Sequence, residues 1–169
     1  MNIKRDTGRL LLAISLALSY LVLSVLPVAA AAGADLDQYA NKGGSWVNGN
    51  LGDSKATYYE GDSVPYRLKL TGLTTGATSH TVTIEWDATK GGKHAFDYLT
   101  TYNRTVTGAN PCAGLTCSAP TTNSGAFTLF GGTITNVSAP STTGSPDGDS
   151  SASVVVTFTA ASADLVLAW

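Results

Sequence analysis

The chain has 169 residues, of which 43% are hydrophobic and 13% charged, and its formal net charge is −2. This length suits about one domain after a leader, large enough to bury a core without several disulfides. The few Lys and Arg residues form no cluster that could neutralise phosphates, which argues against a nucleic-acid partner.

The first 34 residues have the layout of a secretory signal peptide. A basic start precedes an apolar run over Leu10–Leu26, and small residues lead up to Ala34. A charged start, an apolar centre and small residues before a cleavage site are the features of an export signal. We therefore predict a signal-peptide helix in residues 1–34, cleaved after Ala34, and one domain in residues 35–169.

This leader leaves two alternatives open. Small residues ending at Ala30 or Ala32 offer other cleavage positions. The apolar run could also stay as an anchor, but a spanning helix needs about 20 mostly apolar residues, and this run is slightly short and contains three serines. Export predicts a secreted or cell-surface protein whose only membrane contact would be an uncleaved leader.

After the leader, short segments alternate apolar and polar residues, the pattern of strands with one buried face. The alternation is clearest in Val64–Thr71 and His80–Asp87. We expect these two segments to be antiparallel neighbours, with Arg67 and Lys69 on the solvent face across from Thr83 or Glu85.

The remaining predicted strands are Thr57–Glu60, Ala126–Phe130, Thr133–Ser138, Ala152–Ala160 and Asp164–Trp169. The Gly131-Gly132 pair predicts a tight hairpin, and Pro140–Ser151 has the composition of an exposed loop. Roughly seven short strands without helices predict an all-β fold, an antiparallel β-sandwich of the immunoglobulin-like class. A barrel is the alternative.

The last predicted strand stops at Trp169, an inward position, without a turn or polar tail. Domain ends usually fray into solvent. We therefore expect either that this strand closes the sandwich or that the chain is a fragment of a longer protein. An outer-membrane barrel could also end in an aromatic residue, but most of the strands are shorter than the ~9–11 residues that span a membrane.

Cys112 and Cys117 are the two cysteines of the chain and lie close together. In an exported protein they predict a local disulfide that holds a loop. A zinc site would need two further ligands, and His80 and His94 both lie far from the cysteines in the sequence.

Three places could carry catalysis. His94 and Asp97 could belong to a catalytic triad, but the sequence has no Gly-x-Ser-x-Gly motif to supply its serine. The carboxylates within Glu60–Asp62 and Glu85–Asp87 could serve a glycosidase. Turns and solvated strand faces explain these residues equally well, so we predict that the protein is not an enzyme.

Aromatic and acidic loop residues are the candidates for ligand binding. Exposed aromatic rings can stack on sugars, and a first set of candidates is Trp46, Tyr58 and Tyr59, followed by Tyr98 and Tyr102. Asp147 and Asp149 could supply oxygen ligands to calcium. We therefore predict no cofactor, with calcium as the alternative, and glycans as candidate partners.

The runs Tyr59–Arg67, His80–Asp87 and Gly92–Leu99 resemble an uncharacterised module of large bacterial secreted or cell-surface proteins. In such proteins the module precedes other extracellular repeats, and the resemblance covers roughly the whole mature chain. It carries no known catalytic residues and implies other extracellular or cell-surface components as partners. In the resembling modules the final strand continues past the position of Trp169, which supports a fragment.

Three functions follow, in order of preference. The first is a secreted or cell-surface β-sandwich with a structural or adhesive role. The second is a carbohydrate-binding module that uses exposed aromatic side chains. The third is a hydrolase that uses His94 and Asp97.

Overall fold

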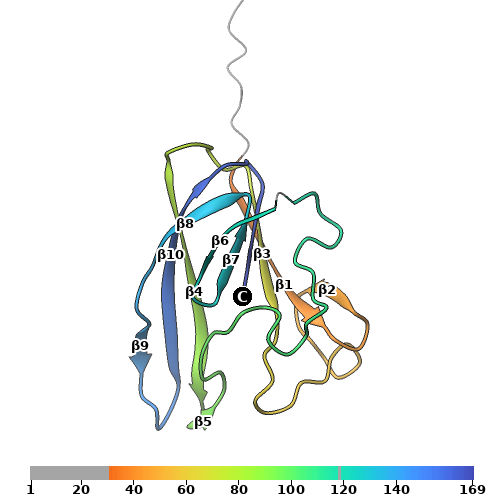
Figure 1. Cartoon of the computed structure of the whole chain (residues 1–169). Coiled ribbons are helices and arrows are strands. Elements are labelled where there is room, and N and C mark those ends of the chain that lie inside the picture. Colours follow the sequence, from red (N-terminus) through yellow and green to blue (C-terminus); the bar gives the residue numbers. More distant parts are fainter. Residues whose placement is uncertain (1–30, 118) are drawn as a thin grey trace, which may run out of the picture. The chain divides into compact units, whose positions relative to one another are not determined.

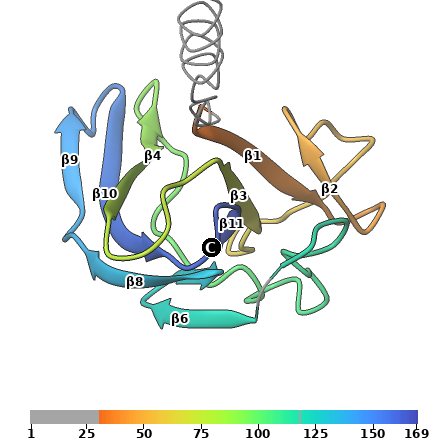
Figure 2. The ribbon, with the colours of Figure 1, turned by 90° about the horizontal axis from the view of Figure 1, so that it is seen from above.

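A computed structural model describes residues 31–117 and 119–169. This part of the chain is all-β and consists of two antiparallel sheets, one of which is curved like a half-barrel (Figures 1 and 2). It has no helix of the length and apolarity that crossing a membrane requires. Residues 1–30 of the predicted signal-peptide helix lie outside the described residues, and Gly33 and Ala34 belong to a strand.

The first sheet has six strands in the order β2-β1-β3-β11-β7-β6. Their bounds are β1 Gly33–Ala40, β2 Ser45–Asn48, β3 Tyr66–Thr71, β6 Pro120–Ser124, β7 Phe127–Phe130 and β11 Leu165–Ala168. Because β3 lies between β1 and β11, this sheet joins segments that are far apart in the sequence.

The second sheet has the order β5-β4-β10-β8, and β9 also pairs with β10. The bounds are β4 Ser79–Lys90, β5 Lys93–His94, β8 Gly132–Val137, β9 Ser141–Gly144 and β10 Ser150–Ala160. The two long strands, β4 and β10, lie side by side along most of their length (Figure 1).

The core lies between the sheets, where the inward side chains of both meet. Its most buried members include Leu129, Val156, Phe158 and Leu167. Burying such a side chain stabilises the fold by about 1.5–3 kcal/mol. Trp169 stacks on Tyr66 with ring centroids 5.7 Å apart. The predicted inward position of Trp169 is therefore confirmed.

The predicted leader boundary falls inside a strand. Gly33 and Ala34 belong to β1 and pair with Thr71 and Leu70 of β3. Cleavage after Ala30 or Ala32 would leave β1 whole, whereas cleavage after Ala34 would shorten it. The position of cleavage stays a prediction.

The predicted pairing of Val64–Thr71 with His80–Asp87 is wrong, although both segments contain strands. β3 pairs with β1 and β11, whereas β4 pairs with β10 and β5. The connection between β3 and β4 crosses from one sheet to the other. Alternation shows which side chains of a strand are buried, but it does not show which strand lies beside it.

The predicted hairpin at Gly131-Gly132 is also wrong, because β7 lies in the first sheet and β8 in the second. Gly131 has a φ of +93°, and a Cβ on Gly132 would collide with the carbonyl oxygen of Thr159. The two glycines thus allow the chain to cross between sheets at close range.

Two local predictions fail as well. Thr57–Glu60 is not a strand, and the side chain of Asn41 hydrogen-bonds both backbone groups of Thr57 instead. The predicted loop Pro140–Ser151 contains β9, an edge strand exposed along its whole length. Polar residues can form such a strand because neither face needs to be buried.

Candidate functional site

A groove of about 1190 Å³ opens between the two sheets, where β1 and β3 face β4. Its walls come from these strands, from segments 58–64 and 94–100, and from Trp169. Its apolar floor consists of Leu36, Tyr66, Leu68, Val82, Ile84 and Trp86. At the other side of the domain β6 lies beside β8 (Figure 2), so the two sheets meet there and are separated at the groove.

Exposed aromatic side chains line the rim of this groove. Tyr59 is 76% exposed, Tyr98 is 65% exposed and Phe96 is 46% exposed. They come from two loops, one before β3 and one after β5. Large apolar side chains that gather in the open are typical of an interaction site.

Five acidic side chains line the groove. They are Glu60, Asp62, Glu85, Asp87 and Asp97, and no Lys or Arg of the described chain lines the groove. A cleft lined by one sign of charge concentrates ligands of the opposite sign. The groove therefore favours a ligand that combines apolar surface with positive charge.

Trp86, which the alternation assigns to the core, forms part of the groove floor. Its indole Nε1 is buried and has no hydrogen-bond partner within the described residues. A buried donor without a partner costs about 1–3 kcal/mol.

The structure separates the predicted aromatic candidates. Tyr58 and Tyr59 line the groove, whereas Trp46 does not. The Tyr58 hydroxyl donates a hydrogen bond of 2.7 Å to the carbonyl oxygen of Tyr39. Burial, followed by the charges of Tyr39 and Asp62, raises the pKa of Tyr58 to about 12. Tyr58 therefore anchors its loop, and Tyr59 is free to contact a ligand.

Trp46 belongs to the outer face of the first sheet and has a packing role there. Its ring meets Tyr39 edge-on at 5.1 Å, and the guanidinium of Arg67 lies 4.9 Å from the ring centre. Its Nε1 donates a hydrogen bond of 2.7 Å to the carbonyl oxygen of Asn110. Each of these contacts is within the domain.

Arg67 is buried, with 7% exposure, although alternation places it on the solvent face. The register of β1 and β3 sets it opposite Asp37, and its Nε donates to the Asp37 carboxylate at 2.8 Å. Its Nη1 donates to the carbonyl oxygens of Pro111 and Ala113 at 2.9 and 2.8 Å. The segment 109–117, which we call the covering loop, thus lies over this face.

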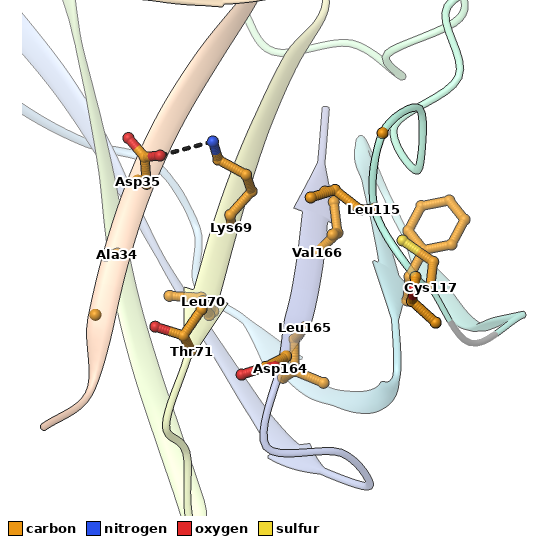
Figure 3. Close-up of a pocket in the computed structure, with 14 residues that line it drawn as sticks. Ala34, Asp35, Lys69, Leu70, Thr71, Leu115, Cys117, Asp164, Leu165 and Val166 are labelled. Atoms are coloured by element: carbon orange, nitrogen blue, oxygen red, sulfur yellow. Dashed lines mark ion pairs between the residues drawn. The ribbon is translucent and has the colours of Figure 1, made fainter. Parts of the chain in front are cut away.

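The predicted Cys112–Cys117 disulfide is present and lies in the covering loop. Both cysteines pack against a small cluster formed by Phe130, Val166 and Ala168 on the outer face of the first sheet. Figure 3 shows this face, with Cys117 beside β7 and Val166 on β11. The disulfide therefore holds the loop on the sheet.

Beside the covering loop lies a smaller hollow of about 630 Å³ (Figure 3). Lys69 forms ion pairs there with Asp35 at 2.6 Å and with Asp37 at 3.2 Å. Hydrogen bonding to Asp35 is the main reason that the pKa of Lys69 is raised. The charge of Lys69 is therefore paired within the protein.

The predicted calcium residues lie in the turn between β9 and β10. The carboxylate of Asp149 accepts hydrogen bonds of 2.7 Å from the backbone N of Gly91 and from Nζ of Lys90, and these bonds lower its pKa. Asp147 is exposed. In the described ranges, no three His, Cys, Asp or Glu residues are grouped to hold a metal. Asp149 therefore links the turn between β9 and β10 to the turn between β4 and β5.

His94 and Asp97 lie at the edge of the groove, and both are largely exposed. Their closest nitrogen and oxygen atoms are 3.6 Å apart, longer than a hydrogen bond. A catalytic histidine needs an orienting hydrogen bond and a nucleophile beside it. The two side chains are therefore not arranged as a triad, and Asp97 contributes a carboxylate to the rim.

Comparison with known proteins identifies no family or homologue: no family model, no curated protein and no solved structure matches the chain.

Proposed function

We propose that this protein is a secreted or cell-surface module without catalytic activity, that it has a structural or adhesive role, and that the groove is its contact surface. One observation carries this proposal: of the six large hydrophobic side chains exposed in the described part, four line the groove. These are Leu36, Tyr59, Phe96 and Tyr98. Isolated exposed hydrophobic residues need no explanation, but a gathered set does.

Three features support the extracellular part of the proposal. The leader has the layout of an export signal, and the disulfide suits an oxidising compartment. The runs that resemble modules of bacterial cell-surface proteins include Tyr59–Arg67 and Gly92–Leu99, which contribute the rim of the groove. We propose that the two sheets form an immunoglobulin-like sandwich, an architecture common in extracellular modules.

Carbohydrate binding is the second candidate, and the rim favours it. The exposed rings of Tyr59 and Tyr98 offer flat apolar surfaces for a sugar. Asp62 and Asp97 line the same groove, and carboxylates accept hydrogen bonds from hydroxyl groups. This candidate differs from the first only in the chemistry of the ligand.

The test is a binding assay with the exported protein against a panel of cell-surface polysaccharides and surface proteins. The double variant Tyr59→Ala/Tyr98→Ala should weaken binding at least about tenfold, because aromatic side chains supply a large share of the binding energy of contact surfaces. Its melting temperature should stay unchanged, since both side chains are exposed.

Val155→Ala is the matched control. Val155 is also an exposed hydrophobic residue, but it lies on β10 outside the groove, so this variant should bind normally. The proposal fails if the double variant binds like the unchanged protein, or if the protein binds no member of a broad panel.

A further inference from the structure

One edge of β4 is open along the groove. β4 pairs with β10 on one side along most of its length, whereas on the other side β5 pairs only with Thr89 and Lys90. Next to this pairing, the backbone N of Phe96 donates to the carbonyl oxygen of Asp87. Over Ser79–Trp86 this edge has no backbone partner in the part of the chain that the structure describes.

The hydrogen bonds of β10 show which backbone groups face the open edge. The backbone N of Ser138 donates to the carbonyl oxygen of Val155, and the backbone N of Val155 donates to Ser138 Oγ. The backbone groups of Val155 therefore point away from β4. Thr83 lies opposite Val155, so this is a non-hydrogen-bonded pair, and the N–H and C=O of Thr83 point to the open edge.

Two further hydrogen bonds agree with this direction. The carbonyl oxygen of Thr157, which lies opposite Thr81, accepts a bond from Thr135 on the β8 side. The carbonyl oxygen of Asp87 faces Phe96 on the open side of β4. Since the direction alternates along a strand, the backbone groups of Thr81, Thr83 and Glu85 all face the open edge.

The open edge of β4 borders the groove. The side chains of Val82, Ile84 and Trp86 belong to its apolar floor, while Thr83 and Glu85 line it beside the edge. A strand laid along this edge would continue the second sheet. Every other side chain of that strand would point between the sheets, onto the floor of the groove.

We propose that the groove binds an extended peptide segment of a partner protein, which adds to the open edge of β4 as an antiparallel strand. Its apolar side chains, at alternate positions, rest on the groove floor, and its basic side chains lie between them on the outer face. In this mode main-chain hydrogen bonds supply affinity and the side-chain positions supply specificity. The inference rests on the proposed function of the groove and names the chemistry of its partner.

The chemistry of β4 favours a peptide over a sugar. Proteins usually protect an open strand edge with lysine, proline or a bulge, because unpaired backbone groups attract other strands. Ser79–Trp86 contains no Lys, Pro or Gly. A sugar stacked on Tyr59 and Tyr98 would leave this edge unpaired, whereas a peptide would satisfy it.

The acidic groove sets the charge of the partner. Glu85 and Asp87 lie on the outer face of β4, and Glu60, Asp62 and Asp97 line the loops beside it. Basic side chains at alternate positions of an added strand would lie beside Glu85 on the same face of the sheet, and opposite charges on neighbouring strands attract.

The test uses the exported protein and a short synthetic peptide in which lysine and valine alternate. Binding should slow hydrogen exchange at the amides of Thr81, Thr83 and Glu85 by at least about tenfold, because these amides gain partners. A peptide with glutamate in place of lysine should not bind. The inference is overturned if the lysine peptide does not bind, or binds without protecting these amides.

Methylated peptides test the strand geometry without changing the protein. In an antiparallel pair the lysines would lie opposite Thr83, so their N–H groups would point at β4 and the valine N–H groups would point away. Methylating the lysine backbone nitrogens should abolish binding, whereas methylating the valine nitrogens should preserve it. Equal effects of the two modifications would contradict the proposal.

The protein offers a matched pair of variants at the centre of the edge. Thr83→Pro removes an N–H that takes no part in the pairing with β10, and edge positions tolerate proline. It should weaken peptide binding about tenfold, whereas Thr83→Val, which keeps the N–H, should change binding less than about twofold. If Thr83→Pro does not fold, the methylated peptides still test whether the peptide adds to β4 as a strand.

Failure of this inference and failure of the proposed function give different results. A glycan that binds the groove without protecting the three amides would overturn strand addition and leave the groove as the contact surface. Full binding by Tyr59→Ala/Tyr98→Ala would instead overturn the proposed function.

Discussion

The outer face of the first sheet and the groove between the sheets contain similar residues, but the described part of the chain covers only the first. On the outer face Trp46 and Arg67 find partners in the covering loop. In the groove Tyr59 is exposed, and the buried Nε1 of Trp86 has no partner among the described residues. The same residue types thus serve packing where a loop covers them and are available for contact where none does.

The covered face shows how charges are buried in this domain. A buried ion pair stabilises a fold only when its remaining hydrogen-bonding groups are also satisfied. Arg67 meets this condition by bonding Asp37 and two loop carbonyl groups. The loop buries Arg67, and Arg67 in turn holds the loop.

The largest effect is expected from Arg67→Met, which removes the centre of the covered face. It leaves the carboxylate of Asp37, only 3% exposed, with Lys69 as its remaining cation. We expect a loss of about 3 kcal/mol in the free energy of unfolding, measured by urea denaturation. Lys90→Met, at an exposed ion pair, is the control, and an equal loss in both variants would contradict this role of Arg67.

Removing the disulfide should loosen the covered face and leave the groove intact. Cys112→Ser/Cys117→Ser should lower the free energy of unfolding by about 2 kcal/mol, as expected for so short a loop. Hydrogen exchange should rise in the covering loop and not in Val82–Trp86. Faster exchange at both places would show that the two regions are not independent.

A smaller effect is expected from Tyr58→Phe, which frees the loop that carries Tyr59. Loss of the hydrogen bond to Tyr39 should cost about 1 kcal/mol at neutral pH. Because folding raises the pKa of Tyr58 from 10.0 to about 12, its contribution is complete below pH 10 and is lost as the pH rises towards 12. Denaturation across this range should show a weaker pH dependence in the variant, and the same dependence would contradict this assignment.

The smallest effect is expected from Asp149→Asn, in the turn between β9 and β10. Its ion pair with Lys90 is exposed, so the melting temperature at pH 7 should change little. Because folding lowers the pKa of Asp149, its contribution is present above the ordinary pKa of 3.8 and is lost as the pH falls through the lowered value. Thermal melts between neutral and acidic pH would show it, and a large loss at neutral pH would be unexpected.

Features that depend on neighbouring residues in the sequence could be predicted from the sequence alone. Alternation located β4 and β10 and the buried side chains on them, and the closeness of Cys112 and Cys117 predicted their disulfide. Each of these features depends on residues within one short segment, and a period of two residues marks the buried face of a strand wherever that strand lies.

Contacts between distant segments became visible only in the tertiary structure. It paired β3 with β1 and β11 instead of β4, and so placed Arg67 opposite Asp37 beneath a loop more than forty residues further along the chain. It also brought Tyr59 and Tyr98 to one groove and left the edge of β4 open. Strand neighbours and covering loops are contacts between distant segments, and alternation within a strand carries no information about its partner.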